Sequence, residues 1–492
     1  MRLEDLASAA GLLLTGDGAA GLEATGLTAD SRAVQPGFVF AALPGARADG
    51  RAFIADAVSC GAVAVLAPEG TPWPQGVPAR PLLTASDARR ALALMAAALH
   101  ARQPATAIAV TGTNGKTSTV DFLRQIWNRA GLKAASLGTL GLRAEGFPPT
   151  PSLTTPDPVA LHVTLEMLVD GGIGHVALEA SSHGIEQRRL DGLRLRAAGF
   201  SNLTRDHLDY HGSMQAYAAA KLRLFDTVLE PGSTAVAHSA LAPEAMSALR
   251  EIAARRNLRL LQVGPEGDAI RLLEQSPTPE GQVLEIDAFG ARHRIGLALP
   301  GRFQADNVLL AAGLAVAGGL PARDVMSLLP FLNGVRGRME RVAVLPNGAS
   351  IYVDYAHTPD ALERLLDALR PHAAGKLHVV FGAGGDRDPG KRPLMGEIAA
   401  RMADRAVVTD DNPRTEVPAT IRAAVRAGMT GGAEAIEIGD RARAIAEAMA
   451  ALGPGDVLAV AGKGHEPGQT IGTVTHPFDD AETVRRIAGM AA

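Results

Sequence analysis

Short apolar runs alternate along the chain with segments in which apolar residues recur every three or four positions. Five of these runs end directly in a polar or glycine-rich segment, namely residues 107–110, 176–178, 379–381, 407–409 and 457–460. Strands that alternate with helices predict an α/β fold with mostly parallel sheets. Such sheets bind ligands at the carboxyl ends of their strands. The pattern therefore predicts ligand sites at these five strand ends.

The same pattern divides the 492-residue chain into three domains, a number that its length also favours. Residues 1–100 are predicted to form a small α/β domain with a helix at 86–100. Residues 101–334 are predicted to form a central domain with a mostly parallel sheet of the P-loop type. Residues 335–492 are predicted to form a Rossmann-like third domain.

Composition and charge narrow the functional classes. With 48 basic and 52 acidic residues, the chain offers no broad basic field for nucleic acid. Glu4 and Asp5 precede any apolar run, which argues against a secretory signal. The longest apolar stretch, residues 308–320, is too short to span a membrane. The single Cys60 lies in an apolar stretch, where we expect it to fill core space. We expect a cytoplasmic monomer with no nucleic-acid partner and no membrane insertion.

Lysine is rare, and its positions carry information. Only six of the 48 basic residues are lysine, and four of the six lie in or beside motifs described below. We interpret them as positions that need a compact or reactive amine, because arginine serves wherever a plain positive charge suffices. The alternative, a random remainder, predicts no such clustering. The six are Lys116, Lys133, Lys221, Lys376, Lys391 and Lys463.

A glycine-rich loop follows the strand predicted at 107–110. Its amides and the start of the next helix can cradle phosphate, Lys116 can reach terminal phosphates and Thr117 can hold magnesium. The strict P-loop pattern has glycine at the position of Val110, so this loop is a variant, and an ordinary glycine-rich turn is the alternative. The candidate nucleotide-binding residues are Gly112, Thr113, Asn114, Gly115, Lys116, Thr117 and Ser118.

Three further side chains favour chemistry near this loop. Glu179 follows an apolar strand, where a carboxylate has no structural reason to lie. With His207 it could ligate magnesium beside a triphosphate, although His207 taken alone is as easily a hydrogen-bonded structural histidine. Lys221 lies seven residues after Met214 in a helical pattern and therefore points with the apolar face. A lysine there must snorkel, pair or lose its charge.

Four segments in a fixed order extend these observations over nearly the whole chain. They are TGTNGKT at 111–117, EASSHG at 179–184, DYHG at 209–212 and VDYAHTP at 353–359. Together they resemble the Mur ligase family. The resemblance implies an ATP-dependent ligase that joins a carboxylate to an amine through an acyl phosphate. One departure is Arg336, where the family has proline.

The resemblance also implies roles for the residues named so far. The loop would bind ATP, and Thr117, Glu179 and His207 would bind Mg²⁺. Lys221 would be carbamylated by carbon dioxide and would support a second Mg²⁺. These groups would neutralise charge on the transferred phosphoryl group and the oxyanion. The catalytic residues would be Lys116, Glu179, His207 and Lys221, with further nucleotide contacts from Asn307, Arg338 and Asp354.

Other segments resemble the family members that add the third residue of the cell-wall peptide. The implied substrates are UDP-MurNAc-L-Ala-D-Glu, which the N-terminal domain would bind, and meso-diaminopimelate, which the C-terminal domain would bind. The implied contacts are Ser31, Ala46, Arg47 and Ala48 for the uridine part, Thr154, Thr155, Ser181, Gln187 and Arg189 for the muramoyl peptide, and Arg387, Asp411, Asn412, Pro413, Arg414, Gly462 and Glu466 for the amino acid.

The identity of the amino acid depends on the DNPR segment at 411–414. Diaminopimelate differs from lysine by a second carboxylate, which an arginine can bind through two parallel hydrogen bonds. The resemblance implies this role for Arg414, because lysine-adding relatives lack that arginine. In isolation, the segment would be interpreted as an Asn-Pro turn with a solvated arginine.

Two other functions stay open at this point. Another amide ligase, such as a folylpolyglutamate synthase or a lysine-adding enzyme, would share the acyl-transfer chemistry, but Arg414 and the N-terminal segment argue against both. A P-loop switch protein would hydrolyse nucleotide to change shape. It would need neither an inward lysine nor an amino-acid pocket.

Overall fold

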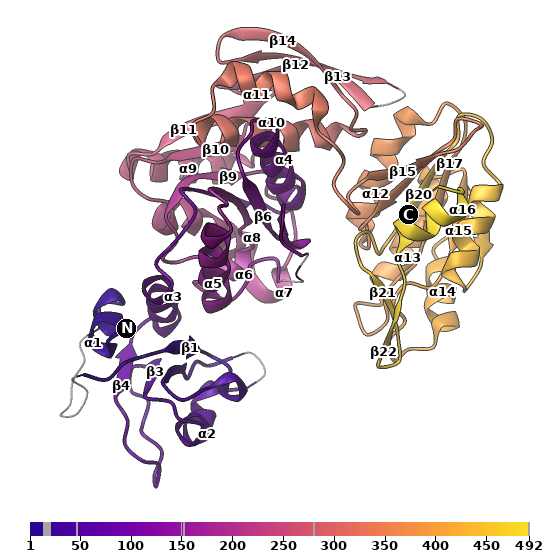
Figure 1. Cartoon of the computed structure of the whole chain (residues 1–492). Coiled ribbons are helices and arrows are strands. Elements are labelled where there is room, and N and C mark those ends of the chain that lie inside the picture. The colour runs from indigo at the N-terminus through magenta and orange to yellow at the C-terminus, as the bar shows by residue number, and fades with distance from the viewer. Residues whose placement is uncertain (13–20, 46–47, 149, 151–152, 279–280, 491–492) are drawn as a thin grey trace. The chain divides into compact units, whose positions relative to one another are not determined.

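A computed structural model of the chain describes residues 1–12, 21–45, 48–148, 150, 153–278 and 281–490 (Figure 1). The chain divides into two compact units, one of residues 1–269 and 310–325 and the other of residues 270–309 and 326–492. Helices and mostly parallel strands alternate in both, so the predicted α/β class is confirmed. None of the helices in the described ranges has the length and apolar character of a membrane span.

The first unit begins with a small parallel sheet whose strands follow in the order β1-β2-β3-β4. Its elements are α1 (Leu3–Ala9), β1 (Gly26–Thr28), β2 (Phe38–Ala41), α2 (Ile54–Ser59), β3 (Ala64–Pro68), β4 (Leu82–Ala85) and α3 (Ala88–Leu99), with 3-10 turns at Ser31–Ala33 and Gly50–Phe53. Successive residues of β2 face opposite sides, so Val39 packs with α1 and α3 whereas Phe40 packs with α2. The domain therefore has a core on each face of its sheet.

Cys60 does not fill core space, so that expectation is wrong. The residue directly follows α2 and is exposed, although Ala57 and Val58 one turn earlier are buried. The helix ends there because Gly61 takes a left-handed φ of +96° and turns the chain. An apolar stretch in the sequence thus contains a helix end that faces solvent.

The second sheet of the first unit has the strand order β11-β10-β9-β5-β8-β6-β7, in which the β6–β7 pair is antiparallel and the other pairs are parallel. Its strands are β5 (Thr106–Thr111), β6 (Ala134–Gly138), β7 (Gly141–Ala144), β8 (His175–Glu179), β9 (Leu195–Phe200), β10 (Thr234–His238) and β11 (Arg259–Gly264). Its helices are α4 (Lys116–Arg129), α5 (Pro158–Asp170), α6 (Ser182–Glu186), α7 (Leu208–His211), α8 (Met214–Arg223) and α9 (Pro243–Arg255). Because helices cover both faces, β5 is buried over nearly its whole length and its sequence is apolar without alternation.

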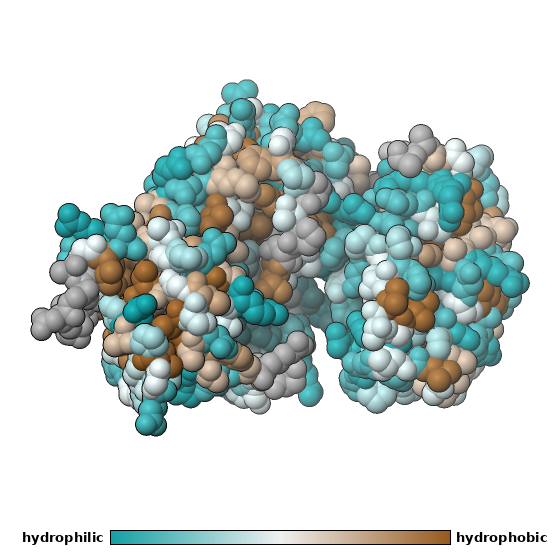
Figure 2. Space-filling view, turned by 60° about the horizontal axis from the view of Figure 1, so that its bottom comes forward, coloured by the Kyte–Doolittle hydropathy of each residue, from teal (hydrophilic) through white to brown (hydrophobic). Residues whose placement is uncertain are grey.

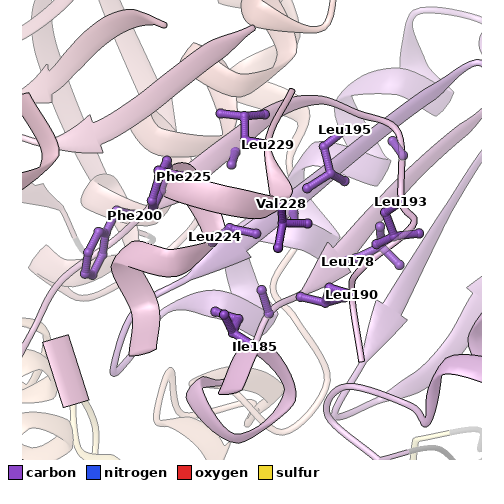
Figure 3. Packing of buried hydrophobic residues seen from close by; sticks show 14 of the residues in the cluster. Leu178, Ile185, Leu190, Leu193, Leu195, Phe200, Leu224, Phe225, Val228 and Leu229 are labelled. Atoms are coloured by element: carbon purple, nitrogen blue, oxygen red, sulfur yellow. The ribbon is translucent and has the colours of Figure 1, made fainter. Parts of the chain in front are cut away.

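A π-helical turn, Leu224–Val228, continues α8 into this core (Figure 3). Its Phe225 stacks on Phe200 of β9 with ring centroids 5.9 Å apart, and Leu224 and Val228 belong to the same buried cluster. This packing fixes the C-terminal end of α8. It therefore also fixes Lys221, one turn earlier.

The second unit begins with the antiparallel strands β12 (Ile270–Thr278), β13 (Gly281–Ala288) and β14 (Ala291–Leu297). The helix α10 (Arg302–Ala317) begins in the second unit and ends in the first, and α11 (Ala322–Leu328) begins in the first unit and ends in the second. The second unit continues with a sheet of order β15-β16-β20-β17-β18-β19, in which only the β15–β16 pair is antiparallel. The strands are β15 (Glu340–Val344), β16 (Ser350–Asp354), β17 (Leu377–Phe381), β18 (Arg405–Val408), β19 (Glu434–Glu437) and β20 (Val457–Ala461). The helices are α12 (Pro359–Leu369), α13 (Lys391–Met402), α14 (Pro418–Arg426), α15 (Arg441–Ala450) and α16 (Asp480–Ile487).

Helices cover both faces of this sheet. Val379 and Phe381 of β17 pack with α12, α13 and α14, whereas Val380 between them packs with α15 and α16. A doubly wound parallel sheet is the Rossmann-like arrangement that the sequence predicts. A separate hairpin, β21 (Gly468–Ile471) and β22 (Val474–Pro477), follows β20. On the face shown in Figure 2, hydrophobic residues lie in small patches between hydrophilic ones.

Candidate functional site

The glycine-rich loop connects β5 to α4, as the sequence predicts. Gly112 has a φ of +144°, and a Cβ there would collide with the hydroxyl of Ser201. Gly115 precedes α4 with a φ of +85°, and Thr117 and Ser118 are buried in the first turn of that helix. Both glycines are therefore required by backbone geometry.

Contacts from the end of β9 hold the loop in place. The Ser201 hydroxyl donates to the Asn114 carbonyl (2.6 Å), and the Asn114 amide donates to the side-chain oxygen of Asn202 (2.9 Å). The Thr113 hydroxyl donates to the Thr204 carbonyl (3.1 Å). The loop conformation is thus fixed by contacts within the protein itself.

Two lysine amines meet at this loop. Lys116 Nζ donates to the carbonyls of Gly112 and Thr113 (2.9 Å each), and Lys221 Nζ donates to the same Gly112 carbonyl (2.7 Å). Lys221 is 1% exposed, so it points inward as its helical position predicts and does not snorkel. Burial lowers its pKa well below the ordinary value, and the charge of Lys116 adds to this effect. The environment favours a neutral amine at position 221.

Glu179 lies at the end of β8, where it is paired in register with Val110 of β5. The carboxylate is 2% exposed, and it accepts hydrogen bonds from the Thr139 amide (2.8 Å) and hydroxyl (3.2 Å). A Cβ on Gly138 would collide with it. A buried carboxylate is therefore fixed on the strand next to the loop strand, at the same edge of the sheet.

The predicted muramoyl-peptide residues form one network around Glu179. The Thr155 hydroxyl donates to the Glu179 carbonyl (2.8 Å) and lies 3.0 Å from the Ser181 hydroxyl. Arg189 donates to the Thr155 carbonyl and to the Gln187 side chain (2.7 Å each). Thr154 joins through the Thr139 hydroxyl (3.1 Å).

His207 is exposed, whereas Glu179 is buried. It adopts a left-handed φ of +51°, and its ring lies edge-on to His183 with centroids 4.9 Å apart. No hydrogen bond or ion pair between described residues joins His207 to Thr117 or Glu179. Within the same residues, no group of three or more His, Cys, Asp or Glu side chains is arranged to hold a metal ion.

The predicted uridine contacts lie in the N-terminal domain. Ser31 begins a 3-10 turn that the Asp30 carboxylate caps, and the Ala48 carbonyl accepts from the Gly45 amide (3.0 Å). The predicted contacts Ala46 and Arg47 lie outside the described residues.

The three predicted nucleotide contacts outside the loop belong to the second unit. Gln304 connects two of them, because it accepts from the Asn307 amide (3.2 Å) and donates to the Arg338 carbonyl (3.5 Å). Asp354 ends β16 and accepts from the amides of Met339 (2.7 Å) and Ala356 (2.8 Å). Burial raises the Asp354 pKa, and the Arg338 charge opposes that rise.

A cavity of about 450 Å³ lies at the carboxyl edge of the C-terminal sheet. The segments that follow β16, β17, β18 and β20 form its wall. Six of the seven residues predicted to bind the amino acid line it, namely Arg387, Asp411, Asn412, Arg414, Gly462 and Glu466. Pro413, between two of them, is buried. Because these residues follow neighbouring strands of one sheet, they meet at its carboxyl edge although they are up to 79 positions apart in the chain.

The hairpin β21–β22 supports the DNPR segment. The Arg414 amide donates to the Thr470 carbonyl (3.0 Å), and the Gly472 amide donates to the Arg414 carbonyl (2.7 Å). Arg414 has a φ of +51°, a conformation that non-glycine residues hold only when their surroundings impose it. Its guanidinium donates to the Gly385 carbonyl (2.7 Å) on the opposite loop.

Sequence reasoning missed part of the cavity wall. Tyr355, His357, Asp388 and Lys391 also line it, and Lys391 donates to the His357 carbonyl (2.9 Å). Burial lowers the pKa of Lys391 and of His357, and it raises that of Tyr355. The signals were present, because Lys391 was one of the six lysines and Tyr355 and His357 lie in the VDYAHTP segment. The wall carries charges of both signs.

Comparisons with known proteins show the family to which the chain belongs. The sequence profile of the Mur ligase middle domain matches residues 110–315, that of the Mur ligase glutamate ligase domain matches residues 337–464, and that of the Mur ligase family catalytic domain matches residues 23–102. The chain belongs to the Mur ligase family. The resemblance based on its motifs is confirmed.

Two similar curated proteins are named UDP-N-acetylmuramoyl-L-alanyl-D-glutamate–2,6-diaminopimelate ligase. The protein of Caulobacter vibrioides is 54% identical over 95% of this chain and 96% of its own length. That of Rhizobium meliloti is 51% identical over 97% of this chain and 96% of its own length.

Solved structures agree on the fold. A structure of a UDP-N-acetylmuramoyl-L-alanyl-D-glutamate–2,6-diaminopimelate ligase has a TM-score of 0.70 at 33% identity and covers 95% of both chains. MurF ligase from Thermotoga maritima in complex with ADP has a TM-score of 0.60 at 19% identity, with 95% of this chain and 97% of that chain covered. The three-domain α/β architecture is that of the Mur ligases.

Proposed function

We propose that this protein is the ATP-dependent ligase that adds meso-diaminopimelate to UDP-MurNAc-L-Ala-D-Glu in peptidoglycan precursor synthesis. The observation that carries the proposal is the C-terminal cavity. It combines Arg387 and Arg414 with Asp411 and Glu466 in one wall. Such a wall suits a molecule with two ammonium and two carboxylate groups, because each charge finds an opposite partner. The names of the similar proteins support the same substrates.

The glycine-rich loop is the proposed triphosphate site. Its amides and Lys116 would bind the phosphates of ATP. Asn307, Arg338 and Asp354 are the other proposed nucleotide contacts. Thr117, Glu179 and His207 would hold Mg²⁺, and the hydroxyl and the fixed carboxylate fit the oxygen preference of that ion. When bound, magnesium would neutralise negative charge on the phosphates.

Lys221 is proposed to carry a carbamate. A neutral amine attacks carbon dioxide, a C–N bond forms and a proton leaves, so the side chain becomes an anion. The burial and lowered pKa of Lys221 support this step, because only the neutral amine is a nucleophile. The anion would sit beside Lys116 and support a second Mg²⁺.

The proposed reaction has two steps. The substrate carboxylate attacks the γ-phosphorus of ATP, so that an acyl phosphate forms and ADP leaves. The amine of the amino acid then attacks the acyl carbon, the C–N bond forms, the C–O bond to phosphate breaks and the amine loses a proton. Lys116 would neutralise charge on the transferred phosphoryl group. Thr154, Thr155, Ser181, Gln187 and Arg189 would orient the peptide end of the acceptor, and Ser31, Ala46, Arg47 and Ala48 its uridine end.

The remaining parts of the proposal concern the whole chain. We propose domain boundaries at about residues 100 and 334, a monomeric state and a cytoplasmic location, where ATP and nucleotide-linked precursors are made. The boundaries follow from the length and the motif order of the sequence.

The test measures ATP-dependent phosphate release with UDP-MurNAc-L-Ala-D-Glu present and the amino acid varied. Release that requires both the acceptor and meso-diaminopimelate is expected. Release that ignores both would favour a nucleotide switch and contradict the ligase. Equal turnover with L-lysine would contradict the choice of amino acid and leave the ligase chemistry intact.

A further inference from the structure

Lys463 is a buried lysine to which no role has yet been given. It follows β20 between Gly462 and Gly464, and its side chain is 0% exposed. Lys463 is not one of the described residues that line the amino-acid cavity, although Gly462 and Glu466 on either side of it are. A buried ammonium is costly, so its partners must account for its place.

Those partners are two residues of the cavity wall. Lys463 Nζ donates to the side-chain oxygen of Asn412 (2.9 Å) and lies 3.4 Å from Oε2 of Glu466. The Asn412 side-chain NH₂ donates to the same Glu466 oxygen (2.9 Å). Lys463, Asn412 and Glu466 therefore form a closed triangle, and only the last two reach the cavity.

The triangle determines how the Asn412 amide is turned. Its oxygen accepts from Lys463 Nζ and from the Thr470 amide (2.9 Å). An ammonium and a backbone amide can only donate, so the atom that faces both must be the oxygen. The NH₂ group of Asn412 is thereby directed to Glu466.

The surrounding charges explain how an ammonium is tolerated there. Burial lowers the pKa of Lys463, and the positive charge of Arg441 lowers it further. The negative charges of Asp411, Glu466 and Asp480 raise it. Arg441 itself is paired with Asp480 in a wholly buried salt bridge. The charge of Lys463 is consequently balanced by the carboxylates of the amino-acid site.

We propose that Lys463 is a positioning residue of the amino-acid site. It fixes the Asn412 amide and holds Oε2 of Glu466, so that the Glu466 carboxylate keeps the orientation in which it can accept an ammonium group of the incoming amino acid. Lys463 acts through these two side chains and does not touch the ligand. This inference rests on the proposed amino-acid ligase function.

The first test is Lys463→Met, which keeps the length of the side chain and removes its charge and donors. The KM for meso-diaminopimelate should rise about ten- to hundredfold, the cost of losing hydrogen bonds to a charged group. The kcat and the KM for ATP should stay near the wild-type values. The thermal unfolding temperature should fall, because removing Lys463 leaves the Glu466 carboxylate without its buried counter-charge. Lys376→Met, at an exposed lysine of the same unit, is the control and should leave all four unchanged.

The second test is a double-mutant cycle. If Lys463 acts through Glu466, Lys463→Met should add little to the KM in a Glu466→Gln background, whereas its effect should add fully to that of Arg387→Ala. Full additivity with Glu466→Gln, an unchanged KM for the amino acid, or an equal rise in the KM for ATP would overturn the proposal. Failure of Lys463→Met to fold would also overturn it, since the lysine would then be structural. If the wild-type enzyme itself showed no amino-acid dependence, the proposed function would fail, and the positioning role with it.

Discussion

Lys221 is a lysine buried in the protein interior, an unusual environment for a charged side chain. Helical spacing predicts its inward direction. The structure adds that the residue is 1% exposed and that burial lowers the pKa of its amine. Its hydrogen bond to the carbonyl of Gly112 spans 109 residues, so no local pattern could have supplied that partner.

Lys221→Arg tests the carbamate. Guanidinium stays protonated and cannot add carbon dioxide, so ligase activity should fall about a hundredfold or more, the usual cost of losing one charge-stabilising group. Added bicarbonate should not restore it, and Lys133→Arg at an exposed position should leave the rate unchanged. Near-normal turnover in Lys221→Arg would remove the carbamate from the mechanism.

Arg414 tests the choice of amino acid. Arg414→Ala should raise the KM for meso-diaminopimelate about ten- to hundredfold, because a charge-assisted contact to the second carboxylate is lost. The KM for ATP should not change, and the preference over L-lysine should shrink. The measurement is steady-state phosphate release with each amino acid, with Arg401→Ala on the exposed part of α13 as control. An unchanged KM for diaminopimelate would refute the role.

At the scale of elements, the strands that carry the site were predictable and the hairpin β21–β22 was not. Runs of buried residues at β5, β8, β17, β18 and β20 are visible in the sequence because both faces of each strand are covered. The hairpin is short and largely exposed, so it lacks that pattern. Its function is apparent only from its contacts with residues 411–414.

Gly472→Val tests the hairpin. Gly472 takes a φ of +60° at the first position of a two-residue turn, and its amide donates to the Arg414 carbonyl. A β-branched residue should cost about 1–2 kcal/mol there, although a Cβ would meet no atom within 4 Å. Since the turn holds Arg414 in its strained conformation, the KM for diaminopimelate should rise several-fold with the KM for ATP unchanged. Gly290→Val, in another open turn with a φ of +84°, should disturb neither.

For the whole molecule, buried histidines predict a pH dependence of stability. Burial lowers the pKa of His162 to about 4 and also lowers that of His175, His357, His372 and His378. His162 is 0% exposed, so burial outweighs the backbone of Asp191, which acts to raise its pKa. As the pH falls below about 6.5, the unfolded chain binds protons that the folded chain refuses, so the free energy of unfolding decreases.

His162 alone should account for about 2 kcal/mol of this loss between pH 7 and pH 5. Urea unfolding at the two pH values measures it, and His162→Leu should make the difference between them smaller by that amount. His476→Leu, at an exposed position on β22, should leave the difference as it is. A His162→Leu chain with the wild-type pH dependence would contradict the prediction.

The sequence by itself determined the features that depend on neighbouring residues. Apolar runs predicted the strands, the glycines at 112 and 115 predicted a tight loop after the first of the five strands, and helical spacing predicted the direction of Lys221. These are properties of a few consecutive residues, which backbone sterics and burial restrict directly.

Only the tertiary structure decided which of these features meet. The cavity is assembled from four loops, the Asn412 amide is oriented by a lysine 51 residues away, and Cys60 is exposed because a helix happens to end there. Such contacts are selected by how strands are ordered and how helices pack on them. They depend on distances in space that the order of residues along the chain does not fix.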